Sequence, residues 1–229
     1  MGDGQGLDGV FVTGTGTEVG KTVVAAVIGR SWAAGGARVA VFKPAVSGLD
    51  EHRGGGDPSR LSDQALLRLA AGSIQSDDEI APYRYGPPVS PHLGAELAGE
   101  TIERERLLSA ARAAGDGADF LVCEGVGGLL VPLTLGYLVR DLARELALPI
   151  VIASEPGLGT INHTLMTVEC ARAVGLEVAA VVLTPWSAEP DVVEASNREA
   201  IERLGRVRVD VLPRIDPADP RDWPGLELP

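Results

Sequence analysis

Short, uninterrupted runs of apolar residues recur along this chain, and helical patterns separate them. The runs lie at residues 10–13, 39–42, 120–123, 150–153, 178–183 and 207–212. Strands that are covered on both faces show such runs, whereas a strand with one wet face alternates apolar and polar residues. Helices are expected at 22–34, 62–71, 101–114, 137–147, 160–174 and 190–204. This alternation predicts a doubly wound α/β domain, with a mainly parallel sheet and helices on both of its faces.

Length and composition allow one domain of this kind. The chain has 229 residues, of which 45% are hydrophobic and 23% charged, and it is interpreted as a single domain over residues 1–229. The stretch 47–60, which contains three consecutive glycines, is expected to be a mobile loop. From about residue 213 prolines recur, and the tail is expected to be irregular.

The charge balance excludes several classes of partner. Asp and Glu (32) outnumber Lys and Arg (20), so the formal charge is −12, which repels phosphate backbones and anionic lipid. Neither nucleic acid nor a membrane is therefore an expected partner. No apolar run approaches the roughly 20 residues that span a bilayer, and residues 1–6 lack the features of a signal peptide. Cys123 and Cys170 are expected to be buried thiols in a reducing cytoplasm.

A glycine-rich loop follows the first predicted strand and reads GTGTEVGKT over residues 14–22. Successive backbone N–H groups in such a loop can cradle phosphate oxygens at the positive end of the following helix. Lys21 is placed to reach the β- and γ-phosphates, and the Thr22 hydroxyl to coordinate Mg²⁺. Five residues separate Gly14 from Gly20, where the strict phosphate-loop pattern has four. The order of strand, glycines, Gly-Lys-Thr and helix nevertheless favours a nucleotide site.

Charged residues follow two further predicted strands, at the sheet edge where α/β domains bind their ligands. Lys43 comes directly after the run 39–42, where an ammonium group would stabilise charge on a transferring phosphoryl group. Glu124 follows the run 120–123, in the place of a carboxylate that holds Mg²⁺. The glycines after Glu124 allow the backbone to approach a ligand closely.

The residue pattern leaves other positions open. Asp63, at a helix start, either complements the helix dipole or adds a metal carboxylate. Glu18, inside the phosphate loop, is either solvated or faces an amino-bearing substrate or the metal. The glycine-containing stretch 154–163 opens a helix and is a second candidate anion site, suited to a carboxylate. His92 and His163 stand apart from any Cys/His cluster and are interpreted as structural.

Together these segments resemble the dethiobiotin synthetases, the ATP-dependent cyclo-ligases of biotin synthesis. The matching blocks are VTGTGTEVGKT at 12–22, KPAVSG at 43–48, SD at 62–63, SPH at 90–92, EGVGG at 124–128 and GTINH at 159–163. The five-residue spacing of the phosphate loop is the spacing of this family. The resemblance implies a homodimer of P-loop NTPase-like subunits, with the active site at the interface, that acts on 7,8-diaminononanoate, CO₂, ATP and Mg²⁺.

The resemblance also implies a role for individual residues, and it favours the functional reading of Asp63 and Glu18. An amine of the substrate captures CO₂ as a carbamate, ATP phosphorylates the carbamate, and the second amine closes the ring. Catalytic roles fall to Lys43, Lys21 and Thr17, and substrate contacts to Ser47, Gly159, Thr160 and Asn162. The implied metal ligands are Thr22, Asp63 and Glu124. The implied nucleotide contacts are Glu18, Val19, Gly20, Lys21, Thr22, Val23, Asp63, Glu124, Gly125, Val126, Gly127, Thr184, Pro185, Pro213, Arg214 and Ile215.

One position departs from the family. Where the family often places an Asn that reads adenine, this chain has Thr184 followed by Pro185. A single rotatable hydroxyl donates or accepts one bond, whereas a carboxamide can pair bidentately with a base edge. We therefore expect weak selectivity for the base, so that other nucleoside triphosphates are accepted.

Two other functions are compatible with a phosphate loop. A kinase of a small metabolite would explain Lys21 and Thr22, but it gives no reason for the stretch 43–47 or for the glycine helix start at Gly159. A partition-type regulatory ATPase carries a second lysine five residues before the phosphate-loop lysine, where this chain has Gly16. ATP turnover that requires diaminononanoate and bicarbonate together would distinguish the synthetase from the regulatory ATPase.

Overall fold

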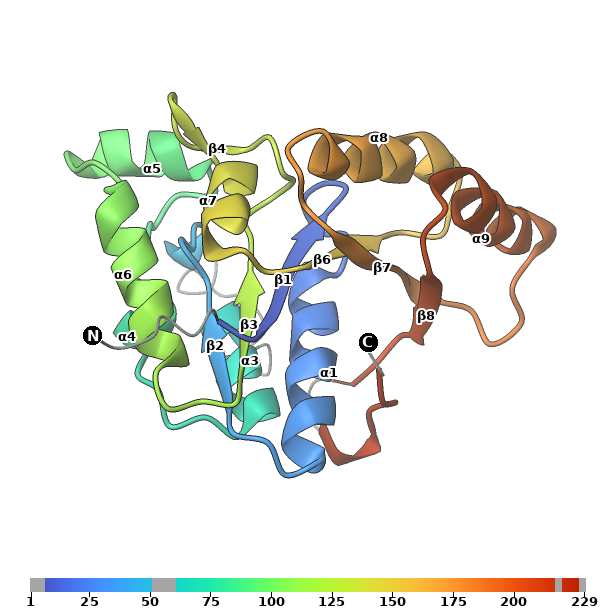
Figure 1. Ribbon diagram of the computed structural model, residues 1–229, viewed down its shortest axis with the longest axis horizontal. Helices are drawn as coiled ribbons and strands as arrows, with labels where there is room; N and C mark the ends of the chain where they lie inside the picture. The colour runs from blue at the N-terminus through green and yellow to red at the C-terminus, as the bar shows by residue number, and fades with distance from the viewer. Residues whose placement is uncertain (1–6, 51–60, 217–219, 227–229) are drawn as a thin grey trace.

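The computed structural model describes residues 7–50, 61–216 and 220–226, and its centre is a six-stranded parallel sheet (Figure 1). The strands are β1 (Gly9–Gly14), β2 (Val39–Phe42), β3 (Phe120–Glu124), β6 (Ile150–Ser154), β7 (Val178–Trp186) and β8 (Val209–Pro213). Their order is β2-β3-β1-β6-β7-β8, and every neighbouring pair is parallel. The predicted doubly wound α/β sheet is confirmed.

Helices cover both faces of this sheet, as predicted. They are α1 (Lys21–Ala34), α3 (Asp63–Ala71), α4 (Asp77–Ile80), α5 (Pro91–Ala98), α6 (Arg104–Gly115), α7 (Val139–Leu146), α8 (Thr160–Arg172), α9 (Val192–Gly205) and the 3₁₀ helix η1 (Pro220–Asp222). One core cluster joins α1 and α3 to the sheet, and the other joins α6, α7, α8 and α9 to its opposite face. The uninterrupted apolar runs are therefore buried from both sides.

Several predicted boundaries differ from the structure. The helix expected at 137–147 begins at Val139, because the two residues before it form β5 (Tyr137–Leu138), which pairs with β4 (Pro132–Thr134) in a hairpin. The helix expected from residue 101 begins at Arg104, and the strand expected from residue 207 begins at Val209. The short helices α4 and α5 were not predicted, because so few residues show little helical periodicity.

The loop expected to be mobile at 47–60 lies partly outside the described residues. Its first part, up to Asp50, is tied to the segment before α5: Gly48 N–H donates to the Pro87 carbonyl at 3.0 Å, and Asp50 N–H to the Gly86 carbonyl at 3.0 Å. This part is therefore fixed by backbone hydrogen bonds, and the prediction for 51–60 is not tested.

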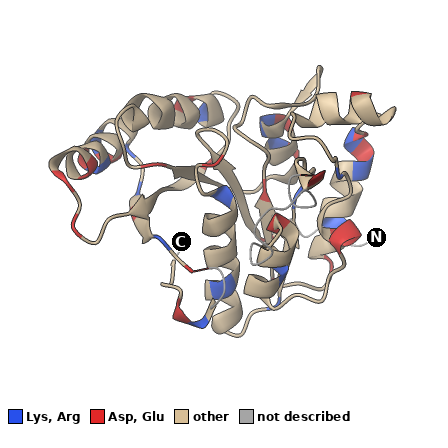
Figure 2. Ribbon diagram, turned by 180° about the vertical axis from the view of Figure 1, so that it is seen from behind, with Lys and Arg blue, Asp and Glu red and all other residues tan. Residues whose placement is uncertain are grey.

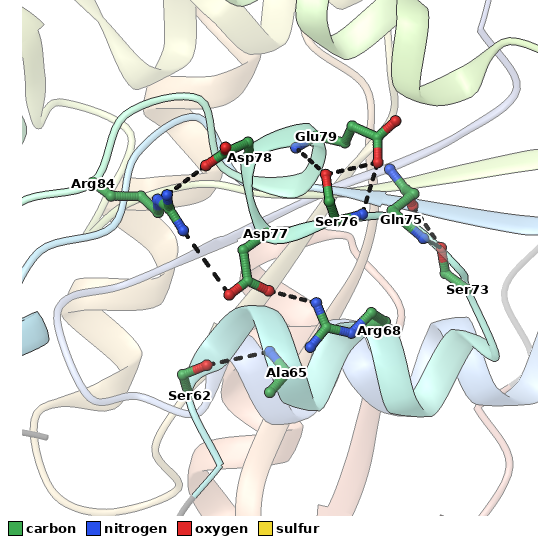
Figure 3. Close-up of polar contacts among 10 residues, drawn as sticks. All are labelled: Ser62, Ala65, Arg68, Ser73, Gln75, Ser76, Asp77, Asp78, Glu79 and Arg84. Carbon is green, nitrogen blue, oxygen red and sulfur yellow. Dashed lines mark hydrogen bonds and ion pairs between the residues drawn. The ribbon is translucent and has the colours of Figure 1, made fainter.

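Side-chain contacts hold α3 and α4 together (Figure 3). Ser62 caps α3 by accepting a hydrogen bond from the N–H of Ala65. Arg68, in α3, pairs with Asp77 of α4, and Arg84 contacts Asp77 from the other side. Because α3 begins at residue 63, these contacts help to fix the place of the carboxylate that opens the helix.

In the described part of the C-terminal tail, 214–216 and 220–226, η1 is the one helix or strand, and this part is anchored to α1. Leu226 is buried, and its N–H donates to the Ser31 hydroxyl at 3.0 Å. Arg30 donates to the Pro220 carbonyl at 3.3 Å, within η1. The tail thus returns to the helix that carries the phosphate loop at its other end.

Charges of both signs lie along α6, as Figure 2 shows. No helix in the described part of the chain is long and apolar enough to cross a membrane. Both cysteines are free; Cys123 is buried as expected, whereas Cys170 is only partly buried, so the prediction of two buried thiols was wrong for Cys170. His92 contacts the Ser90 hydroxyl at 2.9 Å and His163 is exposed.

Candidate active site

The phosphate loop connects β1 to α1 in a conformation that needs its glycines. Gly20 precedes α1 with φ 85°, in the left-handed region. A Cβ atom on Gly14 would lie 2.6 Å from the Val19 side chain, so a larger residue would clash there. Lys21 is buried, and its Nζ donates to the Gly16 carbonyl at 2.7 Å. The ammonium group and the N-terminal end of α1 thus lie at the loop, as an anion site requires.

Thr17 and Glu18 form the exposed apex of this loop. Glu18 has φ 61°, a left-handed conformation that costs a non-glycine residue about 1–2 kcal/mol. Burial lowers the pKa of Lys21, while the nearby charge of Glu124, and more weakly that of Glu18, acts in the opposite direction. Both apex residues are accessible, as the predicted contacts with ligand require.

Three charged side chains meet beside the phosphate loop, at the ends of β2 and β3 and the start of α3. Lys43 Nζ lies 2.6 Å from Asp63 Oδ2 and 2.7 Å from Glu124 Oε1. Lys43 and Glu124 are buried, whereas the Asp63 side chain is 43% exposed. Residues more than 80 positions apart are brought together because parallel strands end at the same edge of the sheet.

Thr22 joins this group to the phosphate loop. Its hydroxyl donates to Glu124 Oε1 at 2.9 Å. We call Thr22, Lys43, Asp63 and Glu124 the charged cluster. The second carboxylate oxygen of Glu124, Oε2, is buried and has no hydrogen-bond partner within the described residues. A buried carboxylate oxygen without a partner is costly, so the cluster is incomplete as it stands.

The charged cluster shifts the pKa of each of its ionisable members. Burial alone would lower the pKa of Lys43, but the charges of Glu124 and Asp63 outweigh burial and raise it above its ordinary value. Burial raises the pKa of Glu124, although the charge of Lys43 opposes this effect. Burial also acts to raise the pKa of Asp63, but Lys43 and Thr22 hold it below its ordinary value. Lys43 is therefore a cation at neutral pH.

The charged cluster has the ligand chemistry of Mg²⁺. No group of three or more His, Cys, Asp or Glu side chains that could hold a metal ion is found in the described ranges. Mg²⁺ does not need such a group, because it binds through one or two carboxylates, keeps several waters and takes oxygens from phosphates. Two carboxylates, one of them with the unpartnered oxygen Glu124 Oε2, and a hydroxyl fit that demand.

The glycine segment after β3 lies against the phosphate loop. Gly125 N–H donates to the Val12 carbonyl of β1 at 2.8 Å, and a Cβ on Gly128 would lie 3.2 Å from the Gly14 carbonyl oxygen. Gly127 has φ 61°, and a Cβ there would clash with Val131 at 2.7 Å. Residues 125–127, which are predicted to contact the nucleotide, thus lie beside the phosphate loop.

The predicted base contacts lie at the ends of β7 and β8. Thr184 is buried, and its methyl group would lie 2.6 Å from a Cβ on Gly20, so Thr184 packs against the start of α1. Pro185 and Pro213 are exposed on the two neighbouring strand ends, where Trp186 pairs with Pro213. Beyond β8, the last two predicted nucleotide contacts are an exposed arginine and a half-buried isoleucine, Arg214 and Ile215.

The predicted substrate contacts occupy two separate places. Ser47 is half-buried in the segment that follows Lys43. Gly159 precedes α8 with φ 94° and Asn162 is exposed, but Thr160 is buried and its hydroxyl contacts the Ser154 hydroxyl at 2.9 Å. The side chain of Thr160 is thus engaged inside the protein, and only its backbone is left for a substrate.

The strand-end rule included Ser154, the last residue of β6, in the candidate anion site at 154–163. It did not predict that the Ser154 hydroxyl lies 3.0 Å from that of Thr164, beneath the start of α8. Thr164 carries no charge and lies outside the predicted stretch, so no local signal marked it.

Comparison with known proteins first defines the class. The AAA domain family matches residues 8–222. A ParA family ATPase of Chlorobium tepidum TLS superposes with a TM-score of 0.52 at 14% identity, covering 91% of this chain and 85% of that chain. The cell division ATPase MinD of Pyrococcus furiosus gives 0.52 at 19% identity, covering 93% and 85%. These structures share the fold, and the chain is a P-loop nucleotide-binding protein.

Sequence relatives then narrow the class to one family. The ATP-dependent dethiobiotin synthetase of Bacillus subtilis (strain 168) is 37% identical over 210 residues, which cover 91% of this chain and 88% of the relative. That of Anaeromyxobacter dehalogenans (strain 2CP-1) is 41% identical over 198 residues, 86% of each. The chain belongs to the ATP-dependent dethiobiotin synthetase family.

Proposed function

We propose that this chain converts 7,8-diaminononanoate and CO₂ to dethiobiotin at the expense of ATP, with Mg²⁺, as a homodimer in the cytoplasm. Membership of the family makes it an ATP-dependent ligase of biotin biosynthesis. The observation that carries the mechanistic proposal is the charged cluster, which joins the phosphate loop through Thr22 to the buried cation Lys43.

The proposed reaction has three steps. An amine of diaminononanoate adds to CO₂ and loses a proton, which leaves a carbamate. A carbamate oxygen attacks the γ-phosphorus of ATP, and ADP leaves. The second amine then attacks the carbonyl carbon of the resulting carbamic-phosphate anhydride, the C–O bond to phosphate breaks, and the ureido ring closes with release of phosphate and a proton.

The second step requires two anions to approach each other, and the lysines of the site reduce their repulsion. Lys21, at the start of α1, is placed to contact the β- and γ-phosphates. Lys43 would lie on the side of the γ-phosphate that the carbamate approaches, where its fixed positive charge stabilises charge that is shared during transfer. Since the neighbouring carboxylates keep Lys43 protonated, it acts by charge and hydrogen bonding and does not act as a base.

Thr22, Asp63 and Glu124 would hold Mg²⁺. When bound, Mg²⁺ neutralises charge on the β- and γ-phosphates. Lys43 already contacts both carboxylates, at 2.6 and 2.7 Å, so the residues that would hold the metal also hold the proposed catalytic cation. This arrangement would position Lys43 against the phosphate chain whatever the nucleotide base.

The substrate would contact two separate places, Ser47 and the first turn of α8. Ser47 would contact the reacting end, and the first turn of α8 at Gly159–Asn162 would take the carboxylate, across the dimer interface. Exposed apolar side chains support burial of this region against a second copy: Leu158 is 97% exposed and Met166 61% exposed. Thr17, at the apex of the phosphate loop, would help to position the substrate.

An isotope experiment tests this function. Purified protein is given Mg²⁺, ATP, diaminononanoate and ¹⁸O-bicarbonate, and both dethiobiotin and the released phosphate are analysed by mass spectrometry. We expect dethiobiotin only when every component is present, and one ¹⁸O in each phosphate, because the carbamate oxygen stays with phosphorus. ATP hydrolysis without the amine and bicarbonate would indicate a regulatory ATPase, and phosphorylation of another metabolite a kinase. Lys21→Ala serves as the inactive control.

A further inference from the structure

Four hydroxyl groups meet between the phosphate loop and α8, and none of the roles above accounts for their contacts with one another. They belong to Thr15 in the loop, Ser154 at the end of β6, and Thr160 and Thr164 in α8; we call them the hydroxyl cluster. Ser154 Oγ lies 3.2 Å from the Thr15 hydroxyl, 2.9 Å from that of Thr160 and 3.0 Å from that of Thr164. The Thr160 and Thr164 hydroxyls are 3.3 Å apart.

The hydroxyl cluster satisfies its own hydrogen-bonding needs. Each hydroxyl has one hydrogen to donate and can accept two bonds. One arrangement satisfies all four contacts: Thr15 and Thr164 donate to Ser154, Ser154 donates to Thr160, and Thr160 donates to Thr164. Every hydrogen is then used within the cluster, so no proton is left for chemistry on a ligand. The cluster therefore fixes the relative positions of the phosphate loop, the end of β6 and the start of α8.

The hydroxyl cluster joins the phosphate loop, which is the proposed nucleotide site, to the start of α8, which is the proposed substrate site. Thr15 lies in the phosphate loop, and its N–H also donates to the Ala153 carbonyl of β6 at 3.1 Å. Thr160 is the first residue of α8, whose N-cap Gly159 has no side chain to cap the helix. Ser154, which is 1% exposed, is the one member that contacts each of the other three.

We infer that Ser154 is a positioning residue that fixes the start of α8 relative to the phosphate loop, so that ordering of the loop by nucleotide also orders the first turn of α8. The inference rests on the proposed function in assigning substrate binding to that turn. In the proposed dimer, that turn lies in the active site shared with the partner, so the hydroxyl cluster would connect the two sites.

Hydrogen exchange tests the link without relying on turnover. Amide exchange is followed by mass spectrometry in peptides that cover the phosphate loop and residues 155–165, with and without saturating MgATP. In the unmodified protein we expect MgATP to slow exchange at least about threefold in both segments. In Thr15→Val, which removes one hydroxyl and keeps the side-chain shape, protection should be confined to the loop. Thr15→Ser, which keeps the hydroxyl, should protect both segments.

Ser154→Ala provides a second test, because it removes all three hydroxyl contacts of the Ser154 side chain. We expect loss of the α8 protection and a rise of at least about fivefold in the KM for diaminononanoate, with the KM for ATP changed less than twofold. Equal protection of α8 in Thr15→Val and the unmodified protein would overturn the inference, as would absence of α8 protection in the unmodified protein. Failure to form dethiobiotin would instead contradict the proposed function, and the exchange result would still decide the link.

Discussion

Two polar clusters flank the phosphate loop, and they are built in opposite ways. On the β3 side of β1, the charged cluster holds one ammonium group and two carboxylates, and one oxygen of Glu124 has no partner among the described residues. On the β6 side, the hydroxyl cluster is neutral, and its four hydroxyls satisfy one another. Both are largely buried, and both connect residues that are far apart in the sequence.

The difference indicates which cluster receives a ligand. A buried carboxylate without a full set of partners is stabilised when a cation arrives, so the charged cluster is a site that ligand completes. A self-satisfied group gains nothing from a ligand and loses stability when any member is removed. The hydroxyl cluster is therefore expected to contribute to geometry and stability, and the charged cluster to chemistry.

The largest effect is expected from Lys43→Ala. Removing one donor that stabilises transition-state charge typically costs 10²–10³-fold in turnover, so kcat should fall at least about 100-fold while nucleotide affinity changes little. Steady-state dethiobiotin formation and calorimetric titration with a non-hydrolysable ATP analogue measure the two quantities. Equal losses of turnover and affinity would show that Lys43 only clamps phosphate.

Ser154→Ala should act on stability instead. It leaves buried hydroxyls without their partner, which costs roughly 1–3 kcal/mol in the free energy of unfolding. Because hydroxyls do not titrate near neutrality, urea denaturation should show the same loss at pH 6 and pH 8. A loss that changes strongly between these pH values would mean that the hydroxyl cluster is coupled to a titrating group. Ser196→Ala, on the exposed surface of α9, is the matched control.

Glu124→Gln tests whether the charged cluster binds Mg²⁺. The amide keeps the shape of the side chain but removes the negative charge, so the Mg²⁺ concentration that half-saturates nucleotide binding should rise about tenfold or more. Titration of a fluorescent nucleotide with Mg²⁺ measures this. An unchanged Mg²⁺ requirement would exclude Glu124 from the metal site.

The base site should show a smaller effect, because a single hydroxyl discriminates weakly. We expect kcat/KM for ATP, CTP, GTP and UTP to differ by roughly tenfold or less, about 1.4 kcal/mol. Thr184→Asn should shift preference toward ATP, whereas Thr184→Val, which keeps the methyl contact with the phosphate loop, should not. An ATP preference above a hundredfold in the unmodified protein would show that other residues read the base.

The smallest effect is expected from the exposed ion pair of Arg38 and Asp119, in contrast to the buried pair of Lys43 and Glu124. Arg38 lies 2.7 Å from Asp119, and its hydrogen bonds lower the pKa of Asp119 to about 2. Because the pKa of Asp119 is lower in the folded protein than in the unfolded chain, where it is ~3.9, the ion pair stabilises the fold at pH values above ~3.9. This contribution is lost as the pH falls toward 2. Asp119→Asn should therefore differ from the unmodified protein at pH 7 and converge with it near pH 2, as followed by urea denaturation. A difference that persists at pH 2 would assign the effect to another group.

Part of this arrangement could be predicted from the sequence because it depends on local patterns. Uninterrupted apolar runs predicted all six strands of the parallel sheet, and the residues that follow them include Lys43 and Glu124. The pattern alone left Asp63 open between a helix-dipole partner and a metal carboxylate; the structure places its carboxylate 2.6 Å from the Lys43 ammonium.

The rest depends on spatial order, which local patterns do not contain. The hydroxyl cluster forms because β6 lies next to β1, and no local signal states which strands are neighbours. The hairpin of β4 and β5 has strands of three and two residues, too short for a periodic signal, so Tyr137 was wrongly placed in a helix.

The position of β1 also has a consequence for synthesis of the chain. β1 lies at the centre of the sheet, yet its partners come much later: Gly9 pairs with Leu121, and Phe11 with Ile150. At about 5–20 residues per second, a ribosome makes β3 on the order of ten seconds after β1. During that interval the nascent chain exposes an apolar strand with two unpaired edges, which is prone to aggregate. Chaperones are therefore expected to act on this protein chiefly during translation, before residue 150 has emerged.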